Sequence, residues 1–228
     1  MELRKGTMKN SPFVGVFAKA TDAFVLVPKQ AQKKEIAGLR DFFGVEIIST
    51  NIVNSSLLGV YAIANKHGVM LPELSEESEL KQLEQAGLRV KKLSWKEEEK
   101  KKTTEALGNL FALNDSKGVY SKMVPKEKVK EIENFLKVEL EQVEIAGSDL
   151  VGSAMVATNR GFIAHAGTTK KELEFLEKLL GVKGKATSAN YGDPFVGKSV
   201  VANSNAALVG LHTTPHEMFR IDEGLGRR

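Results

Sequence analysis

The chain has 228 residues, a net charge of +4 from 33 basic and 29 acidic side chains, and no cysteine. The lack of cysteine excludes disulfides, thiolate zinc sites and cysteine nucleophiles, and it is typical of a reducing compartment. No stretch approaches the roughly 20 apolar residues that span a bilayer. The N-terminal segment MELRKGTMKNSP lacks the apolar core of a signal peptide. We therefore expect a cytoplasmic protein that does not bind a membrane.

A short unit recurs five times along the chain. The clearest copy, SLLGVYAIANKHGVMLP from Ser56, has an apolar run through Gly59, a polar turn and a second apolar run that ends at Pro72. The other copies begin at Phe13, Ala106, Leu150 and Phe195. The first glycines of the five copies are Gly15, Gly59, Gly108, Gly152 and Gly197. This near-constant spacing predicts a repeat architecture, because no single unit is long enough to bury a core of its own.

Each unit is predicted to have the order strand, tight turn, strand, helix, strand, with the repeat glycine in the first strand. The turns are rich in Asn, Asp and Gly, which tolerate the positive φ of tight hairpins. The predicted units extend over about 13–49, 56–93, 106–143, 150–187 and 195–224 of a single domain, residues 1–228. The fifth unit lacks its own last strand. An N-terminal strand at residues 1–5 would supply it and remove an exposed edge.

The clearest predicted helix follows the fourth hairpin. Thr169 and Glu172 form a capping-box pattern, Leu176 and Leu180 continue an apolar stripe, and Gly181 ends the helix. In the second unit, residues 91–102 form a charged insertion, KKLSWKEEEKKK. We interpret it as a solvated strand end and loop; the alternative is an arm that contacts a ribonucleoprotein. Trp95, the only tryptophan, is expected to pack beside it.

Two short patterns match a nucleotide-binding site and a metal site, but the residues around them do not favour either site. GDPFVGKS at residues 192–199 matches the phosphate-binding P-loop pattern, but such a loop must open a helix, and here a strand and a turn are predicted to follow. His212 and His216 have the spacing of metal ligands on a helix, but the intervening residues are typical of a helix cap, and a third protein ligand is missing. We therefore expect no nucleotide, no metal, no other cofactor and no catalytic residue.

Polar side chains of the turns remain as candidates for a binding surface. Each of them is also explained by turn chemistry, because Asn and Asp bond their own backbone and accept unusual φ angles. Asn109 is different, since it directly follows a repeat glycine where the other units have Val16, Val60, Ser153 and Lys198. Strand packing therefore does not require an amide there, and its donors and acceptor suit pairing with a partner.

Five groups of residues, spread over nearly the whole chain, form a recognisable set: TNIVNSSLLG (50–59), ANKHG with Pro72, ALGN (106–109) with Asn114 and Asp115, VGS…TNRGF…H (151–165) and VVANS…GLHTTPHE (200–217). Together they resemble the archaeal branch of the translation initiation factor 6 family, which prevents association of the ribosomal subunits. The resemblance implies an α/β pentein fold, in which five ββαβ-type units form a closed propeller with pseudo-five-fold symmetry.

The resemblance also implies a function without enzymatic activity. A monomer would bind the large ribosomal subunit, near the sarcin–ricin loop of its RNA and the adjoining ribosomal proteins, and would block the small subunit. The predicted ribosome-binding residues are Asn65, Lys66, His67, Asn109, Asn114 and Asp115. Two alternatives stay open: a pentein that binds RNA or ribosomes during maturation of the large subunit, and a guanidino-group enzyme without the cysteine nucleophile that such enzymes use.

Overall fold

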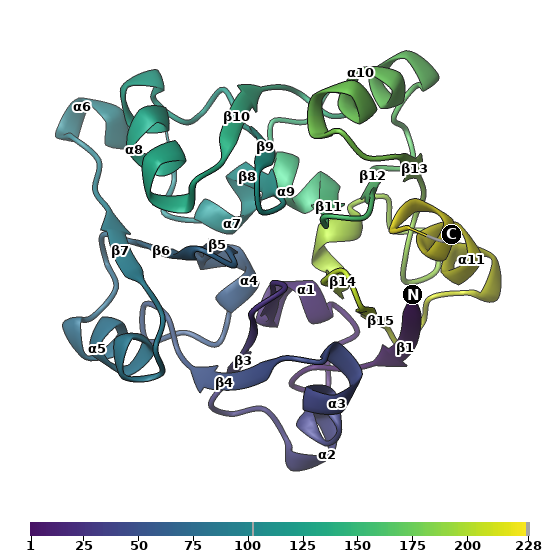
Figure 1. Cartoon of the computed structure of the whole chain (residues 1–228), viewed down its shortest axis with the longest axis horizontal. Coiled ribbons are helices and arrows are strands. Elements are labelled where there is room, and N and C mark those ends of the chain that lie inside the picture. Colours follow the sequence, from purple (N-terminus) through teal and green to yellow (C-terminus); the bar gives the residue numbers. More distant parts are fainter. Residues whose placement is uncertain (102, 227–228) are drawn as a thin grey trace.

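The computed structural model describes residues 1–101 and 103–226, so that Lys102 of the predicted insertion and residues 227–228 of the predicted domain lie outside it. The fold is α/β, with five small sheets of three strands each in the described residues. Figure 1 shows the five units around a common centre, with the sheets and the short helices nearest the centre and the longer helices outside them. No helix among the described residues is long and apolar enough to cross a membrane.

The elements of the first three units repeat one order. The first unit contains α1 (Val14–Phe17), β2 (Lys19–Ala20), β3 (Phe24–Pro28), α2 (Lys33–Ile36), α3 (Leu39–Phe43) and β4 (Glu46–Thr50). The second contains α4 (Leu58–Tyr61), β5 (Ile63–Asn65), β6 (Gly68–Pro72), α5 (Glu77–Gln85) and β7 (Val90–Leu93). The third contains α6 (Glu97–Lys100), α7 (Leu107–Leu110), β8 (Phe111–Leu113), β9 (Lys117–Tyr120), α8 (Lys126–Leu136) and β10 (Glu139–Gln142).

The last two units follow the same order, and the fifth is completed from the other end of the chain. The fourth contains α9 (Val151–Ala154), β11 (Met155–Ala157), β12 (Phe162–Ala164), α10 (Lys170–Leu180) and β13 (Gly184–Ala186). The fifth contains the 3₁₀ helix η1 (Val196–Lys198), β14 (Val200–Ala202), β15 (Ala206–Gly210) and α11 (Pro215–Gly224). Its third strand is β1 (Glu2–Gly6), which pairs in parallel with β15 where the sequence analysis expected the N-terminal strand.

Each sheet combines a hairpin with a parallel third strand. In the first unit β2 pairs antiparallel with β3, and β3 pairs in parallel with β4 from Phe24↔Glu46 to Pro28↔Thr50. The parallel pairing requires a crossover, which α2 and α3 supply. These two short helices replace the one helix predicted there, because Gly38 takes a left-handed φ of 70° between them.

The repeat glycines lie in short helical turns, which corrects their predicted place in the first strand of each unit. An ideal Cβ on Gly59 of α4 would lie only 1.8 Å from the carbonyl oxygen of Gly15 in α1. The same approach joins Gly108 to Gly59, Gly152 to Gly108, Gly197 to Gly152 and Gly15 to Gly197, at 1.9, 2.0, 2.2 and 2.1 Å. Each unit thus touches its neighbour through backbone where no side chain fits.

The hydrophobic cores are shared between neighbouring units. Val25 and Val27 of β3 pack into the core of the first unit, whereas Phe24 and Leu26 of the same strand pack into the core of the second, against Leu83 of α5. The strand is therefore buried on both faces. Because a separated unit would expose one of these faces, the units depend on one another for their stability.

The insertion contains a short helix, α6, where the sequence analysis expected only a strand end and a loop. Trp95 is 4% exposed and packs with Leu93, Leu107 and Val124, which confirms its predicted packing role.

Replacing a repeat glycine tests the contact between units. Gly59→Ala should lower the free energy of unfolding by about 3 kcal/mol or more, because a backbone carbonyl occupies the place of the new methyl group. Gly181→Ala is the control: φ is 73° there and no atom lies within 4 Å, so only the left-handed conformation costs energy, about 1 kcal/mol. Denaturant titration measures both. Equal losses would show that the contact between units is not what requires glycine.

Candidate functional site

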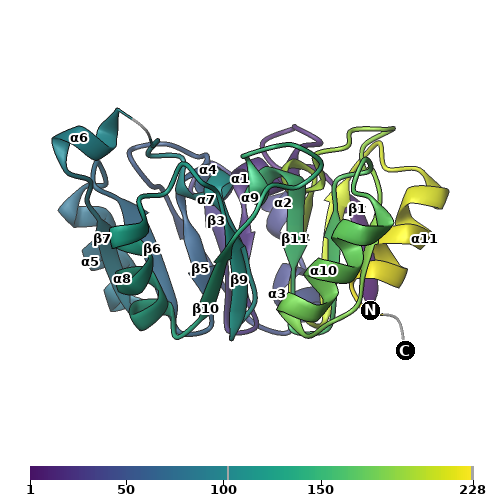
Figure 2. The same cartoon turned by 90° about the horizontal axis from the view of Figure 1, so that it is seen from above.

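The molecule has two different ends, which Figure 2 shows from the side. We call one the turn end; it carries the five hairpin turns near residues 22, 66, 115, 159 and 204. We call the other the glycine end; it carries the five short helices with the repeat glycines and the loops that precede them. The strands that run between the two ends are short, and β8 has only three residues.

Asn65 and Asn114 hold the turn end together from inside. Asn65 is 2% exposed; its Oδ1 accepts from the backbone N–H of His67, and its Nδ2 donates to the carbonyls of Asn114 and Leu136 at 3.3 and 2.8 Å. Asn114 is 6% exposed and likewise accepts from the N–H groups of its own turn, at Ser116 and Lys117. The turns of the second and third units therefore lie side by side, and these two amides are occupied within the protein.

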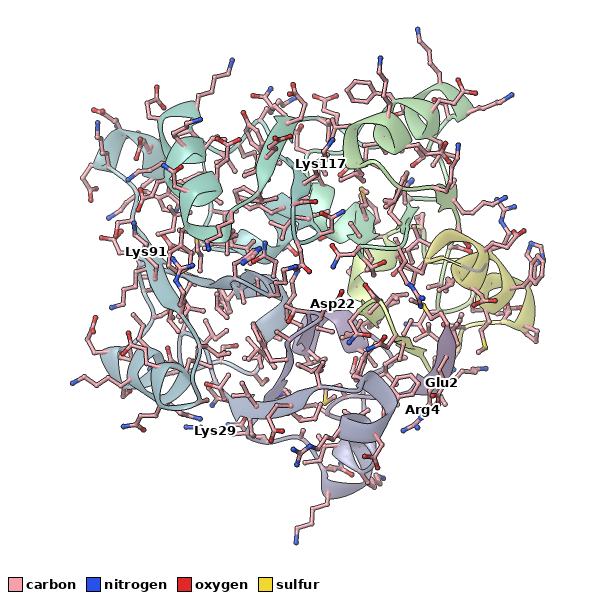
Figure 3. The ribbon with its side chains drawn as sticks, in the orientation of Figure 1. Glu2, Arg4, Asp22, Lys29, Lys91 and Lys117 are labelled. Atoms are coloured by element: carbon pink, nitrogen blue, oxygen red, sulfur yellow. The ribbon has the colours of Figure 1, made fainter. Side chains whose placement is uncertain are left out.

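The charged groups of the turn end also bind one another. The backbone N–H of Lys66 donates to Asp115 Oδ1 at 3.0 Å, and the Lys66 ammonium lies 3.5 Å from Oδ2. Asn159 donates to both Asp115 and Asp22, and Ser204 donates to Asp22 through its N–H and its hydroxyl. Figure 3 shows Asp22 near the centre of the ring of units. This network gives the turn end an internally satisfied polar surface, on which Lys66 is exposed and His67 half-buried.

Asn109 lies at the other end of β8, in α7. Its Oδ1 accepts a hydrogen bond from the hydroxyl of Ser153 in α9 at 3.0 Å, so that the amide links two neighbouring units. Asn109 is half-buried beside the molecular axis. The six predicted residues thus divide: Asn109 belongs to the glycine end and the other five to the turn end. Their role in binding a ribosome stays a prediction.

Five of the large exposed apolar side chains lie at the glycine end. Tyr191 is 81% exposed, Leu74 62%, Leu211 47%, Phe13 39% and Leu150 38%. All five lie in loops at this end, either before a short helix or directly after the central strand of a sheet. The two other large exposed apolar residues of the described chain, Phe175 and Phe219, lie on α10 and α11 at the periphery.

Buried or half-buried glutamates fix the loops that carry some of these side chains. Glu217 of α11 accepts from the N–H groups of Tyr191 and Gly192 at 3.2 and 2.8 Å, and also closes the capping box with Thr214. Glu35, Glu79 and Glu172 occupy the same helical position and accept from the N–H groups of Asn10, Asn54 and Ala146 in the corresponding loops.

The glutamates rigidify strained turns. Lys9 and Asn10, Val53 and Asn54, and Asn190 and Tyr191 all have positive φ angles, which are costly for side chains other than glycine. The carboxylates compensate for this cost by bonding the N–H groups at the tips. Sequence reasoning recognised the capping box of Thr169 and Glu172, but it missed the bonds to loops about 25 residues away, which no local pattern reveals.

The third unit departs from this arrangement. Its helix α8 has Lys128 where the other units have the glutamate, and α6 replaces the tight loop. Glu99 of α6 instead accepts from the N–H of Lys96 in the insertion itself. The glycine end is therefore asymmetric, with a charged projection at the third unit.

The pKa values of three of these glutamates reflect their bonds. Burial by itself would raise the pKa of Glu217, but donors including the Thr214 and Gly192 N–H groups and the Ser188 hydroxyl outweigh it, so that the pKa lies below 4.5. Burial and bonding oppose each other in the same way at Glu35, whose pKa is also lowered. The hydroxyl of Thr169 makes the largest contribution to the lowered pKa of Glu172.

The remaining sequence motifs have structural explanations. Lys198, the lysine of the P-loop pattern, pairs with Asp193 at 3.0 Å, and strand β14 follows it rather than a helix. His212 lies outside α11, whose N-cap is Thr214. No group of His, Cys, Asp and Glu side chains suited to a metal ion is found in residues 1–101 and 103–226.

Comparison with known proteins identifies the family. The model of the eIF-6 family matches residues 3–224, and the chain belongs to this family. Among curated relatives, each called "Translation initiation factor 6", the protein of Methanocaldococcus jannaschii is 38% identical over 94% of this chain and 94% of its own. The protein of Thermoplasma acidophilum is 36% identical over 98% and 99%, and that of Pyrococcus abyssi 34% identical over 99% of each. All three are archaeal, and their name describes a translation factor.

Solved structures give only distant similarities. A dimethylarginine dimethylaminohydrolase in an adduct with S-methyl-L-thiocitrulline has a TM-score of 0.47 and 14% identity, over 93% of this chain and 73% of that enzyme. An agmatine deiminase of C. jejuni has a TM-score of 0.37 and 16% identity, over 57% of this chain and 50% of the enzyme.

Removing the Glu217 carboxylate should loosen the Tyr191 loop. We expect Glu217→Gln to destabilise the protein by about 1–3 kcal/mol at pH 7, because hydrogen bonds to a buried charged group are lost. The pKa of Glu217 is lower in the folded state than in the unfolded state, so the unfolded state binds a proton first as the pH falls. The stability that the ionised carboxylate contributes is therefore lost as the pH falls below 4.5. The deficit of the variant should therefore shrink in acid.

Thermal unfolding between pH 7 and pH 3 measures this difference, with Glu174→Gln on the exposed face of α10 as the control. A deficit that stays constant with pH would contradict the assignment of a lowered pKa to Glu217.

Proposed function

We propose that this protein binds the large ribosomal subunit through its glycine end and thereby prevents association with the small subunit. The match of the eIF-6 family over residues 3–224, together with the name shared by full-length relatives, supports a role in translation initiation. We further propose that the protein acts as a cytoplasmic monomer, binds near the sarcin–ricin loop and blocks the small subunit sterically. These details are supported by the family resemblance described above.

The fold that supports this function is proposed to be a single, closed five-unit pentein domain. The contact between Gly15 and Gly197 and the pairing of β1 with β15 support closure, because both join the first part of the chain to the last. A closed arrangement leaves two ends available for a large partner, in addition to the helical periphery. The ribosome-facing surface is therefore sought at one of these ends.

We choose the glycine end because of its exposed apolar side chains. A soluble protein rarely gathers exposed Tyr, Phe and Leu side chains on one face unless the face binds a partner. Aromatic residues are also enriched among the residues that contribute most to binding, since they bury much area with few rotatable bonds. Tyr191 combines high exposure with a backbone fixed by Glu217, which lowers the entropy lost on binding.

The turn end is the rival surface. Two of its exposed cations have partners within the protein: Lys66 pairs with Asp115, and Arg160 donates to the carbonyl of Ser204. The amides of Asn65 and Asn114 also donate to carbonyls within the protein. We assign Lys66 and His67 at most a peripheral electrostatic role, which would act mainly on the association rate. Asn109, half-buried at the glycine end, keeps its proposed contact with the large subunit.

Truncating Tyr191 tests the surface directly. Tyr191→Ala should weaken binding to purified large subunits about tenfold or more, which corresponds to about 1.4 kcal/mol. Its melting temperature should change little, because the side chain is 81% exposed. Phe175→Ala, which removes a 52% exposed ring from the periphery, is the matched control and should bind like the parent. If both variants bind like the parent, Tyr191 is not part of the interface.

Asn109→Ala and Lys66→Ala compare the two ends. We expect Asn109→Ala to weaken binding by about 1–3 kcal/mol, because a partner group is left unpaired. It should also lower the free energy of unfolding by about 1 kcal/mol, because the Ser153 hydroxyl loses its acceptor. Lys66→Ala should have a smaller effect, mostly at low salt. Affinity for large subunits and the melting temperature are measured for each variant. A larger loss of affinity for Lys66→Ala would assign the interface to the turn end.

A further inference from the structure

A cavity of about 60 Å³ lies on the axis of the molecule, inside the ring of repeat glycines. The five glycines line it, together with small apolar residues of the first strands. Asn109, Ser153 and Lys198 line it on the side of the short helices. A buried water needs roughly 10–15 Å³ of such volume, so the cavity has room for about four water-sized groups.

Lys19 is the unexpected residue in this cavity. Strand alternation points its side chain away from the core of the first unit, into which Ala18 and Ala20 pack. The equivalent positions of the other units, four residues after the repeat glycine, hold Ile63, Ala112, Val156 and Val201. The fold is thus built with apolar residues at this position, and the lysine is not needed for packing.

The Lys19 ammonium has no counter-charge in the cavity. No hydrogen bond or ion pair of its side chain is found among the described residues, and no carboxylate is among the lining residues. Lys19 is half-buried by accessible area, and it lines this small cavity. Burial lowers the pKa of Lys19 to about 8. An uncompensated cation of this kind is costly unless an anion accompanies it.

The other charged groups near the axis have hydrogen-bond or ion-pair partners within the protein. Lys198 pairs with Asp193 at 3.0 Å. At the turn end, Asp22 accepts from Ser204 and Asn159, and Asp115 accepts from Lys66 and Asn159. These two aspartates line a second, smaller cavity and not the one that contains Lys19. Among the residues that line the axial cavity, Lys19 and Lys198 are the two charged ones, and of these only Lys198 has an ion-pair partner within the described chain.

We propose that the axial cavity binds a small tetrahedral oxyanion, with Lys19 as its counter-charge. The four oxygens of such an ion match the number of water-sized groups that the cavity accommodates. Lys198, on the side of the short helices, is neutralised by Asp193, so that Lys19 supplies the positive charge. The site lies directly beneath the glycine end, and its occupation would stabilise the contacts of the first unit with its neighbours. The inference is independent of the proposed ribosome binding.

Sulfate is the probe, because it does not titrate near neutral pH. At constant ionic strength set with sodium chloride, sulfate should raise the melting temperature of the parent protein at pH 7, by about 5–10 °C at about 100 times its Kd. The rise should disappear above pH 9, where Lys19 is neutral. Calorimetric titration at pH 8 in buffers of different ionisation enthalpy should show proton uptake on sulfate binding, because the anion favours the charged ammonium.

Lys19→Met separates this site from general salt effects. The variant should melt at or above the temperature of the parent without sulfate, because it restores the apolar residue type of the other units, and it should lose the sulfate-dependent rise. Lys19→Gln serves if the Met variant does not fold. Lys130→Gln, on the exposed face of α8, is the surface control and should keep the rise. An equal rise in parent and Lys19 variants, or no rise in the parent, would overturn the proposal.

Discussion

The structure depends on the close approach of backbone at the repeat glycines. Each glycine packs against a carbonyl of the preceding unit at a distance that excludes even one methyl group, and Gly15 makes this contact with Gly197 of the last unit. Dense packing of this kind allows little adjustment. It brings the five short helices together around the axis, and this sets where the loops, the cavity and Asn109 lie. The shared cores then bury both faces of strands such as β3.

Much of the fold could be predicted because its signals are local. Turn residues, apolar runs and the capping box of Thr169 predict the hairpins and the helix α10 from neighbouring residues alone. The short helices could not be predicted, because an apolar run such as LLGVY is equally typical of a strand. A contact between units decides its conformation. Gly38 also divides the helix predicted for the first unit into two, because it takes a left-handed conformation in the folded chain.

The candidate site was predicted less well for a geometric reason. Asn109 and Asn114 are close in sequence, but a three-residue strand separates them and places them at opposite ends of the molecule. The amides of Asn65 and Asn114 proved to be turn chemistry, which the sequence analysis had left as an alternative. No sequence motif signals three further features, because they depend on contacts between residues distant in sequence. These are the exposure of Tyr191, the hydrogen bonds that Glu217 makes to the Tyr191 loop, and the unpaired side chain of Lys19.

The central functional claim is that the glycine end faces the large ribosomal subunit. Because the chain has no cysteine, single cysteines can report on each end separately. Lys29→Cys and Lys66→Cys replace exposed lysines at the glycine end and the turn end. Maleimide labelling is then timed with and without saturating large subunits. The account predicts that the subunit slows labelling at position 29 at least about tenfold and leaves position 66 unchanged. Protection at position 66 alone would contradict it.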